Sequence, residues 1–119
     1  MKLPKELKAA ILNQARAEIP YECCGLIASN QGNIQYFPCK NLSTEPKESF
    51  ALGGYDRVED ENDEILALVH SHPGHSIEFS PLDISACEES GVPWIVVDPI
   101  SESWGYLDPF LTLHKIEVT

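Results

Sequence analysis

Basic residues are scarce in this chain of 119 residues. It has 8 Lys and Arg against 19 Asp and Glu, which gives a formal net charge of −11 with the histidines neutral. A chain this acidic repels phosphate backbones, so nucleic-acid binding is not expected. The densest acidic run is EDENDE, residues 59–64. Solubility is the plainer explanation of such runs, and attraction of a basic partner is the alternative.

Long apolar segments are also missing. No stretch approaches the roughly 20 apolar residues that span a bilayer, so we expect no membrane span. The first 20 residues, MKLPKELKAAILNQARAEIP, predict an amphipathic helix and not the apolar core of a secretion signal. These absences favour a cytoplasmic protein.

Cysteines are few and do not have metal-binding or redox spacing. Cys23, Cys24, Cys39 and Cys87 form no Cys-x-x-Cys pair, and adjacent cysteines cannot easily bond to each other. We expect reduced thiols, with Cys23, Cys24 and Cys87 in the core, although the even count leaves disulfides open.

The pattern of apolar and turn residues predicts an α/β fold, with a single domain over residues 1–119. The expected order is a mixed sheet with helices packed against it. Helices are predicted at 3–18, 55–63 and 80–91, and strands at 23–29, 34–39, 64–72, 92–98, 103–108 and 110–118. Residues 40–56 read as a loop, because Pro46 and the pair Gly53, Gly54 interrupt them.

Two histidines close the predicted strand at 64–72. His70 and His72 are spaced by two, so their side chains should lie on the same face of the strand. Two imidazoles that converge at a strand end suit a zinc ion. Polar residues at a strand end would explain two histidines equally well if they were considered alone.

The predicted helix at 80–91 begins with a second pair of polar residues. Asp83 could fold back as a third ligand, which would leave a fourth zinc position for water. Ser80 and Asp83 also have the spacing of a capping box, and an acid in the first turn is favoured by the helix dipole. Capping explains these two residues fully, but it does not explain the histidines.

A hydrolytic zinc site needs a base that is not a ligand. Glu22 is a candidate, because it follows Pro20 and precedes a buried strand, which should place it at an edge of the sheet. The sequence alone does not bring Glu22 near His70. Taken by itself, Glu22 is more simply an exposed glutamate.

The combined pattern resembles the JAMM (MPN+) zinc metalloprotease family. In that family an upstream Glu is followed by His-Ser/Thr-His-Pro and, seven residues later, by Ser-x-x-Asp. Here the corresponding segments are PYECCGLI (20–27), HSHP (70–73) and SPLD (80–83), with residues 73–79 between the second His and the Ser. The resemblance extends over residues 20–98, in order.

The resemblance implies a cytidine-deaminase-like, three-layer α/β fold and a zinc cofactor. The matching positions would make His70, His72 and Asp83 the zinc ligands. Glu22 would hold the attacking water and shuttle its proton, and Ser80 would stabilise the developing oxyanion. The two roles of Ser80 are compatible, because a hydroxyl group both accepts and donates hydrogen bonds.

Three further segments resemble the small bacterial and phage branch of the family. They are QYFPCKN (35–41), ALVHSHP (67–73) and GVPWIVV (91–97), and they look like the N-terminal part of lambda-type phage tail assembly proteins. An NlpC/P60 cysteine peptidase domain usually follows that part, so murein hydrolysis is not expected of this chain. The implied partners are tail proteins or such a domain, in the host cytoplasm or the virion tail.

The main hypothesis is a zinc peptidase that cuts a peptide or isopeptide bond during tail assembly, with a ubiquitin-like protein as one candidate substrate. The alternatives are a peptidase that trims a ubiquitin-like sulfur carrier, and a non-catalytic scaffold. Nucleoside deaminases share the fold, but their His-x-Glu and Pro-Cys-x-x-Cys motifs are absent. Three residues are expected to lie outside the site. His75 should be exposed in a loop, and Trp94 and Trp104 should lie in the core.

Overall fold

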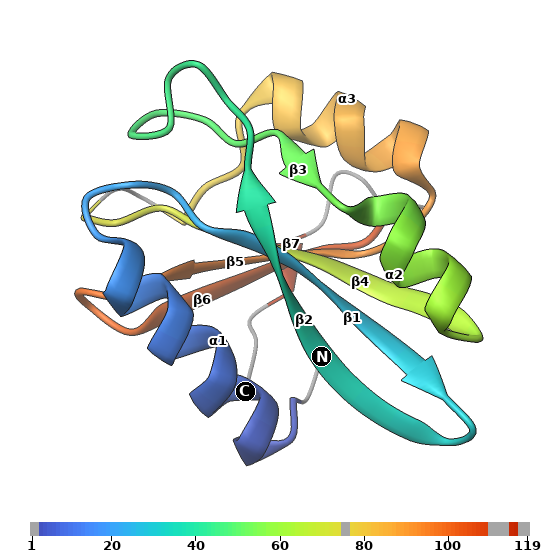
Figure 1. The fold of residues 1–119 in the computed structure, drawn as a ribbon. Coiled ribbons are helices and arrows are strands. Elements are labelled where there is room, and N and C mark those ends of the chain that lie inside the picture. The colour runs from blue at the N-terminus through green and yellow to red at the C-terminus, as the bar shows by residue number, and fades with distance from the viewer. Residues whose placement is uncertain (1–2, 75–76, 110–114, 117–119) are drawn as a thin grey trace.

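The computed structural model describes residues 3–74, 77–109 and 115–116 (Figure 1). His75 and most of the predicted strand at 110–118 therefore lie outside the described residues. The helices are α1 (Lys5–Glu18), α2 (Tyr55–Glu61) and α3 (Pro81–Ser90). The strands are β1 (Cys24–Asn30), β2 (Asn33–Asn41), β3 (Leu52–Gly53), β4 (Glu64–Ser71), β5 (Trp94–Asp98), β6 (Ser103–Leu107) and β7 (Lys115–Ile116).

The predicted mixed sheet is confirmed. In the described residues, seven strands lie in the order β3-β2-β1-β4-β5-β6-β7. Strands β4 and β5 are parallel, because α3 connects them by a crossover, and the other neighbouring strands are antiparallel. Among the described helices, none is long and apolar enough to cross a membrane.

The predicted loop at 40–56 is wrong at both of its ends. Strand β2 continues to Asn41, and the two residues of β3 pair with Lys40 and Asn41. The pairing covers only the last two residues of β2, in the described part of the chain. Pro38, which has no amide hydrogen, lies within β2 next to this short covered stretch.

Helices cover both faces of the sheet, as the three-layer prediction requires (Figure 1). Helix α1 packs on one face with its buried residues Leu7, Ile11 and Ala15. We call this side the α1 face. Helices α2 and α3 pack on the opposite side, which we call the α3 face.

The core consists of one apolar cluster on each face. The cluster on the α1 face contains Leu3, Leu7, Ile11, Ala15, Cys23, Ile27, Ala67, Val69, Ile95, Val97, Trp104 and Tyr106. The cluster on the α3 face contains Leu26, Ala28, Val58, Leu68, Phe79, Cys87, Trp94, Val96 and Leu107. Both tryptophans are buried as predicted, and all four cysteines are free thiols, of which only Cys39 is partly exposed.

The order of the strands brings distant segments to one end of the sheet. Strand β1 runs antiparallel to β4 with Cys24 opposite His70, so the start of β1 lies beside the end of β4. Helix α3 begins after the turn that leaves β4. The segments that carry Glu22, the histidines and Ser80 therefore meet at this end.

Candidate metal centre and active site

The start of α3 is fixed by the predicted capping box. The Asp83 amide donates a hydrogen bond to the Ser80 hydroxyl oxygen at 3.1 Å, and the Ser80 amide donates to Asp83 Oδ2 at 3.0 Å. Pro81 occupies the first helical position, and Gly91, with a φ of 70°, ends the helix. The reciprocal bonds hold the Asp83 carboxylate at the N-terminus of α3, near the end of β4.

His70 is completely buried on the α3 face. Its ring lies among Phe50, Trp94 and Phe79, with centroid separations of 4.6, 5.5 and 6.0 Å. Neither ring nitrogen has a hydrogen-bond partner among the described residues. Burial, followed by the nearby His72, holds the pKa of His70 well below its usual range. The ring is therefore neutral, which is the form that binds a metal ion.

The predicted ligands come together. The His72 ring stacks on that of His70 at 4.9 Å between centroids, and the ligand atoms of His70, His72 and Asp83 all lie within 4.8 Å of one another. Two imidazoles and one carboxylate are a donor set that suits catalytic zinc, with the fourth position open. The buried nitrogens of His70 support this fit, because without a partner they cost free energy.

Glu22 lies in the same pocket, although the sequence favoured an exposed position. The residue as a whole is only 4% exposed. Burial, and then the negative charge of Asp83, raises its pKa from 4.5 to about 7. The Glu22 amide donates to the Pro46 carbonyl at 2.7 Å, and its carbonyl accepts from Asn41 Nδ2 at 2.9 Å. The loop after β2 thus fixes the backbone of this residue.

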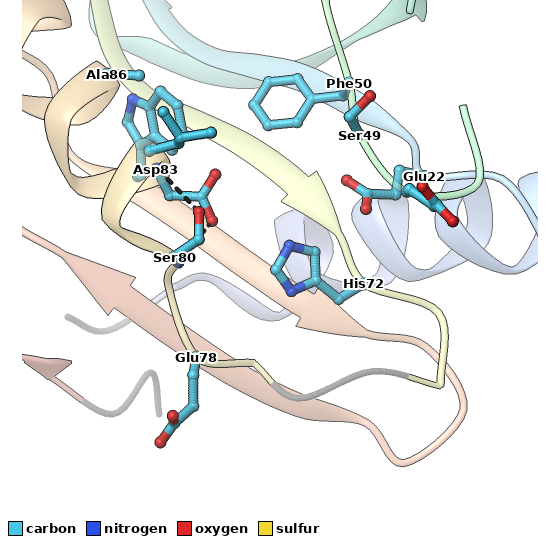
Figure 2. A pocket seen from close by; sticks show the side chains of 11 residues that line it. Glu22, Ser49, Phe50, His72, Glu78, Ser80, Asp83 and Ala86 are labelled. Carbon is cyan, nitrogen blue, oxygen red and sulfur yellow. Dashed lines mark hydrogen bonds between the residues drawn. The ribbon is translucent and has the colours of Figure 1, made fainter. Parts of the chain in front are cut away.

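A pocket of about 760 Å³ opens at this end of the sheet. Figure 2 shows Glu22, His72 and the Ser80–Asp83 pair around it, from three separate segments of the chain. The lining residues are Glu22, Glu48, Ser49, Phe50, His72, Glu78, Ser80, Leu82, Asp83, Ala86 and Trp94. The structure therefore gathers all five residues that the sequence singled out, four on the wall of the pocket and His70 in the ligand cluster.

Several residues of the pocket were not predicted. Phe50 and Ser49 lie in a segment that the sequence predicted to be a plain loop, so no local pattern pointed to them. Asn41 was missed as well, and it ties this loop to Glu22 by donating also to the Ser49 carbonyl at 3.0 Å. Trp94 is core, as predicted, but its ring also lines the pocket.

Known proteins share both the sequence and the fold. The family model described as "Prokaryotic homologs of the JAB domain" matches residues 4–106. Tail tip assembly protein K of Escherichia phage N15 is 43% identical over 89 residues, which are 74% of this chain and 37% of that protein. The chain thus spans well under half the length of this relative.

Two solved structures carry the comparison of the folds. A JAB1/MPN domain protein from Archaeoglobus fulgidus is 21% identical with a TM-score of 0.68, over 100% of this chain and 99% of that one. A structure described as "JAMM: A Metalloprotease-like Zinc Site in the Proteasome and Signalosome" is 20% identical with a TM-score of 0.64, over 100% and 97%. The predicted fold is confirmed, and the chain belongs to the JAB/MPN domain family, among its prokaryotic homologues.

Proposed function

We propose that this chain is a zinc-dependent peptidase of the JAMM type, which hydrolyses a peptide or isopeptide bond. The observation that carries the proposal is the buried His70 ring, whose two nitrogens have no partner among the described residues, beside His72 and Asp83. Buried polar atoms normally have partners, so this arrangement supports a metal ion held by the three side chains. The family and the zinc site named for one structural relative point the same way.

The metal and Glu22 would share the work of activating water. A bound zinc ion would polarise the substrate carbonyl and lower the pKa of a water to about 7. Glu22 would take a proton from the attacking water at its carboxylate and pass it to the amine that leaves as the C–N bond breaks. The raised pKa of Glu22, about 7, suits a group that both accepts and returns a proton near neutral pH.

Ser80 and the apolar wall would complete the site. The Ser80 oxygen accepts the Asp83 amide, so its own hydrogen is left to donate to the substrate oxygen as negative charge develops there. Phe50 and Trp94 line the pocket and would keep bulk water away from the reacting bond.

The substrate proposed is a protein of phage tail assembly, with a ubiquitin-like protein as one candidate. This rests on the 43% identity to a tail tip assembly protein. The proposed partners are tail proteins or an NlpC/P60 domain, in the host cytoplasm or the virion tail. A charge of −11 makes nucleic acid an unsuitable partner.

Elemental analysis of protein purified without added metal tests the metal site. We expect about one equivalent of zinc, as a site with three protein ligands should bind tightly. Less than about 0.2 equivalents, with no uptake on titration, contradicts the proposal.

Mass spectrometry tests the reaction. The zinc-loaded protein is incubated with tail proteins and, separately, with ubiquitin-like sulfur carriers that end in Gly-Gly-x, alongside Glu22→Gln. Cleavage of tail proteins by the wild type alone supports the proposal. If only the carriers are trimmed, the substrate is a ubiquitin-like sulfur carrier and not a tail protein. If zinc is bound but nothing is cleaved, the chain is better explained as a non-catalytic scaffold.

A further inference from the structure

The strands β1 and β4 separate at the site, and one hydroxyl group bridges them. Ser71, the last residue of β4, is completely buried. Its amide donates to the Cys23 carbonyl at 3.0 Å, as in a regular antiparallel pair. The return bond is different, because the Cys23 amide donates to Ser71 Oγ at 2.8 Å. A side-chain oxygen therefore stands where the ladder would use a backbone carbonyl.

Past this bridge, the chain continues to bond to β5, the other neighbour of β4. The next amide, that of His72, donates to the Val97 carbonyl of β5 at 2.8 Å. The chain thus leaves β1 and stays on β5, and the pocket opens where the two strands part. The Ser71 hydroxyl keeps the last contact between them.

The bridge connects the two halves of the proposed site. Cys23 directly follows Glu22, and Ser71 lies between His70 and His72. Ser71 is not among the residues that line the pocket, since alternation along β4 places it with Val69 on the α1 face. It therefore lies on the opposite face of the strand from His70 and does not line the pocket.

We propose that Ser71 is a positioning residue, which fixes Glu22 relative to the histidine pair through the Cys23 amide. The role of Glu22 in this inference rests on the proposed function. Cys23 is only 2% exposed, so its amide depends on a partner from within the protein. Alanine at position 71 would leave the Cys23 amide buried without a partner, whereas threonine keeps an oxygen at the same place.

Amide hydrogen exchange in the metal-free protein tests the bridge without any need for catalysis. We expect the Cys23 amide to be protected in the wild type and to exchange at least about tenfold faster in Ser71→Ala, because a buried bond is lost. Ser71→Thr should restore the protection. Asn62→Ala, which loses a bond from Nδ2 to the Val58 carbonyl at the end of α2, should leave Cys23 protected.

Kinetics of the zinc-loaded protein test the consequence for Glu22. In Ser71→Ala we expect kcat to fall about 10–100-fold, as for other supporting contacts around metal sites, with zinc affinity and KM nearly unchanged. Ser71→Thr should recover most of kcat. A fall in kcat with unchanged zinc affinity indicates that Glu22 is misplaced, whereas damage to the histidines would lower zinc affinity as well.

Three results overturn the inference. The first is a Cys23 amide in the wild type that exchanges as fast as an exposed one, a result that does not depend on any variant folding. The second is a Ser71→Thr variant that behaves like Ser71→Ala, and the third is a loss of zinc affinity as large as the loss of kcat. A wild type that cuts nothing counts against the proposed function, and the exchange data then still decide on the bridge.

Discussion

Val69 and His70 are neighbours on β4, and both are completely buried. Val69 packs into the apolar cluster of the α1 face, where no proposed ligand lies. His70 points to the α3 face, among aromatic rings, and brings two nitrogens without partners in the described part of the chain. Val69 and His70 are therefore equally buried with different consequences. Burial of Val69 contributes apolar packing, whereas burial of His70 keeps its imidazole neutral and able to bind a metal ion.

Substituting each of these two neighbours in turn is the strongest test of that contrast. Val69→Ala should cost about 2 kcal/mol of unfolding free energy and leave zinc stoichiometry unchanged, because it removes only apolar contacts. His70→Leu should abolish zinc binding, a larger loss than the roughly 10–100-fold that supporting residues cost. In the metal-free state it should be as stable as the wild type or more so, because two unpaired buried nitrogens disappear.

Urea unfolding with added chelator, and zinc titration, measure both variants of this pair. Zinc binding by His70→Leu equal to that of the wild type would place the metal elsewhere. If Val69→Ala is folded but loses zinc, metal binding depends on the α1 face as well, and the two faces do not have separate roles.

Glu22 sharpens the contrast within the α3 face, because it is proposed to act without holding the metal. Glu22→Gln should lower kcat about 10²–10⁴-fold, as loss of a general base does, while one equivalent of zinc remains bound. Glu89→Gln, on the exposed side of α3, serves as the matched control. Parallel loss of zinc and activity in Glu22→Gln would make Glu22 a ligand instead.

Ser80 has both a structural and a proposed catalytic role, and two variants separate them. Ser80→Ala should lower kcat about 10²–10³-fold as a lost oxyanion donor, and it should destabilise α3 by about 1 kcal/mol as a lost cap. Ser80→Gly should lose the same activity but only a few tenths of the stability, because glycine is tolerated at this position. Activity that follows helix stability across the two variants would leave Ser80 as a cap alone.

The smallest expected effect is a change of unfolding free energy with pH, caused by Glu22 in the pocket on the α3 face. The pKa of Glu22 is about 7 in the folded protein and 4.5 ordinarily. A raised pKa means that its contribution to stability is full below pH 4.5 and is lost as the pH rises through 7. The metal-free wild type should therefore lose on the order of 1 kcal/mol between pH 5 and 8 relative to Glu22→Gln, after allowance for solvent screening.

Urea unfolding at the two pH values measures this difference. Val69→Ala serves as the control, because it should keep the wild-type pH dependence while its overall stability is lower. A Glu22→Gln variant with the same pH dependence as the wild type would show that the Glu22 carboxylate is not desolvated.

Local patterns predicted much of this molecule, because they depend on neighbours in the chain. The helix ends at Ser80 and Gly91 were readable, since capping involves residues only a few positions apart. The common face of His70 and His72 follows from strand geometry alone.

Long-range pairing could not be predicted in the same way. Glu22 lies near the histidines only because β1 pairs with β4 in one register, Cys24 opposite His70, across more than 40 residues of chain. Phe50 reaches His70 because Asn41 and Pro46 hold the loop over the start of β1. No local pattern encodes these contacts, and only the family resemblance connected Glu22 to the histidines.

The short β3 has a consequence for behaviour at high concentration. It pairs with two of the nine residues of β2, so most of that strand offers a bare edge in the described part of the chain. Such edges can recruit a second copy and start aggregation. Pro38 removes one amide donor from β2, and Lys40 adds a charge near the covered end. Replacing Pro38 with valine would therefore be a poor choice for anyone who needs concentrated, monodisperse protein.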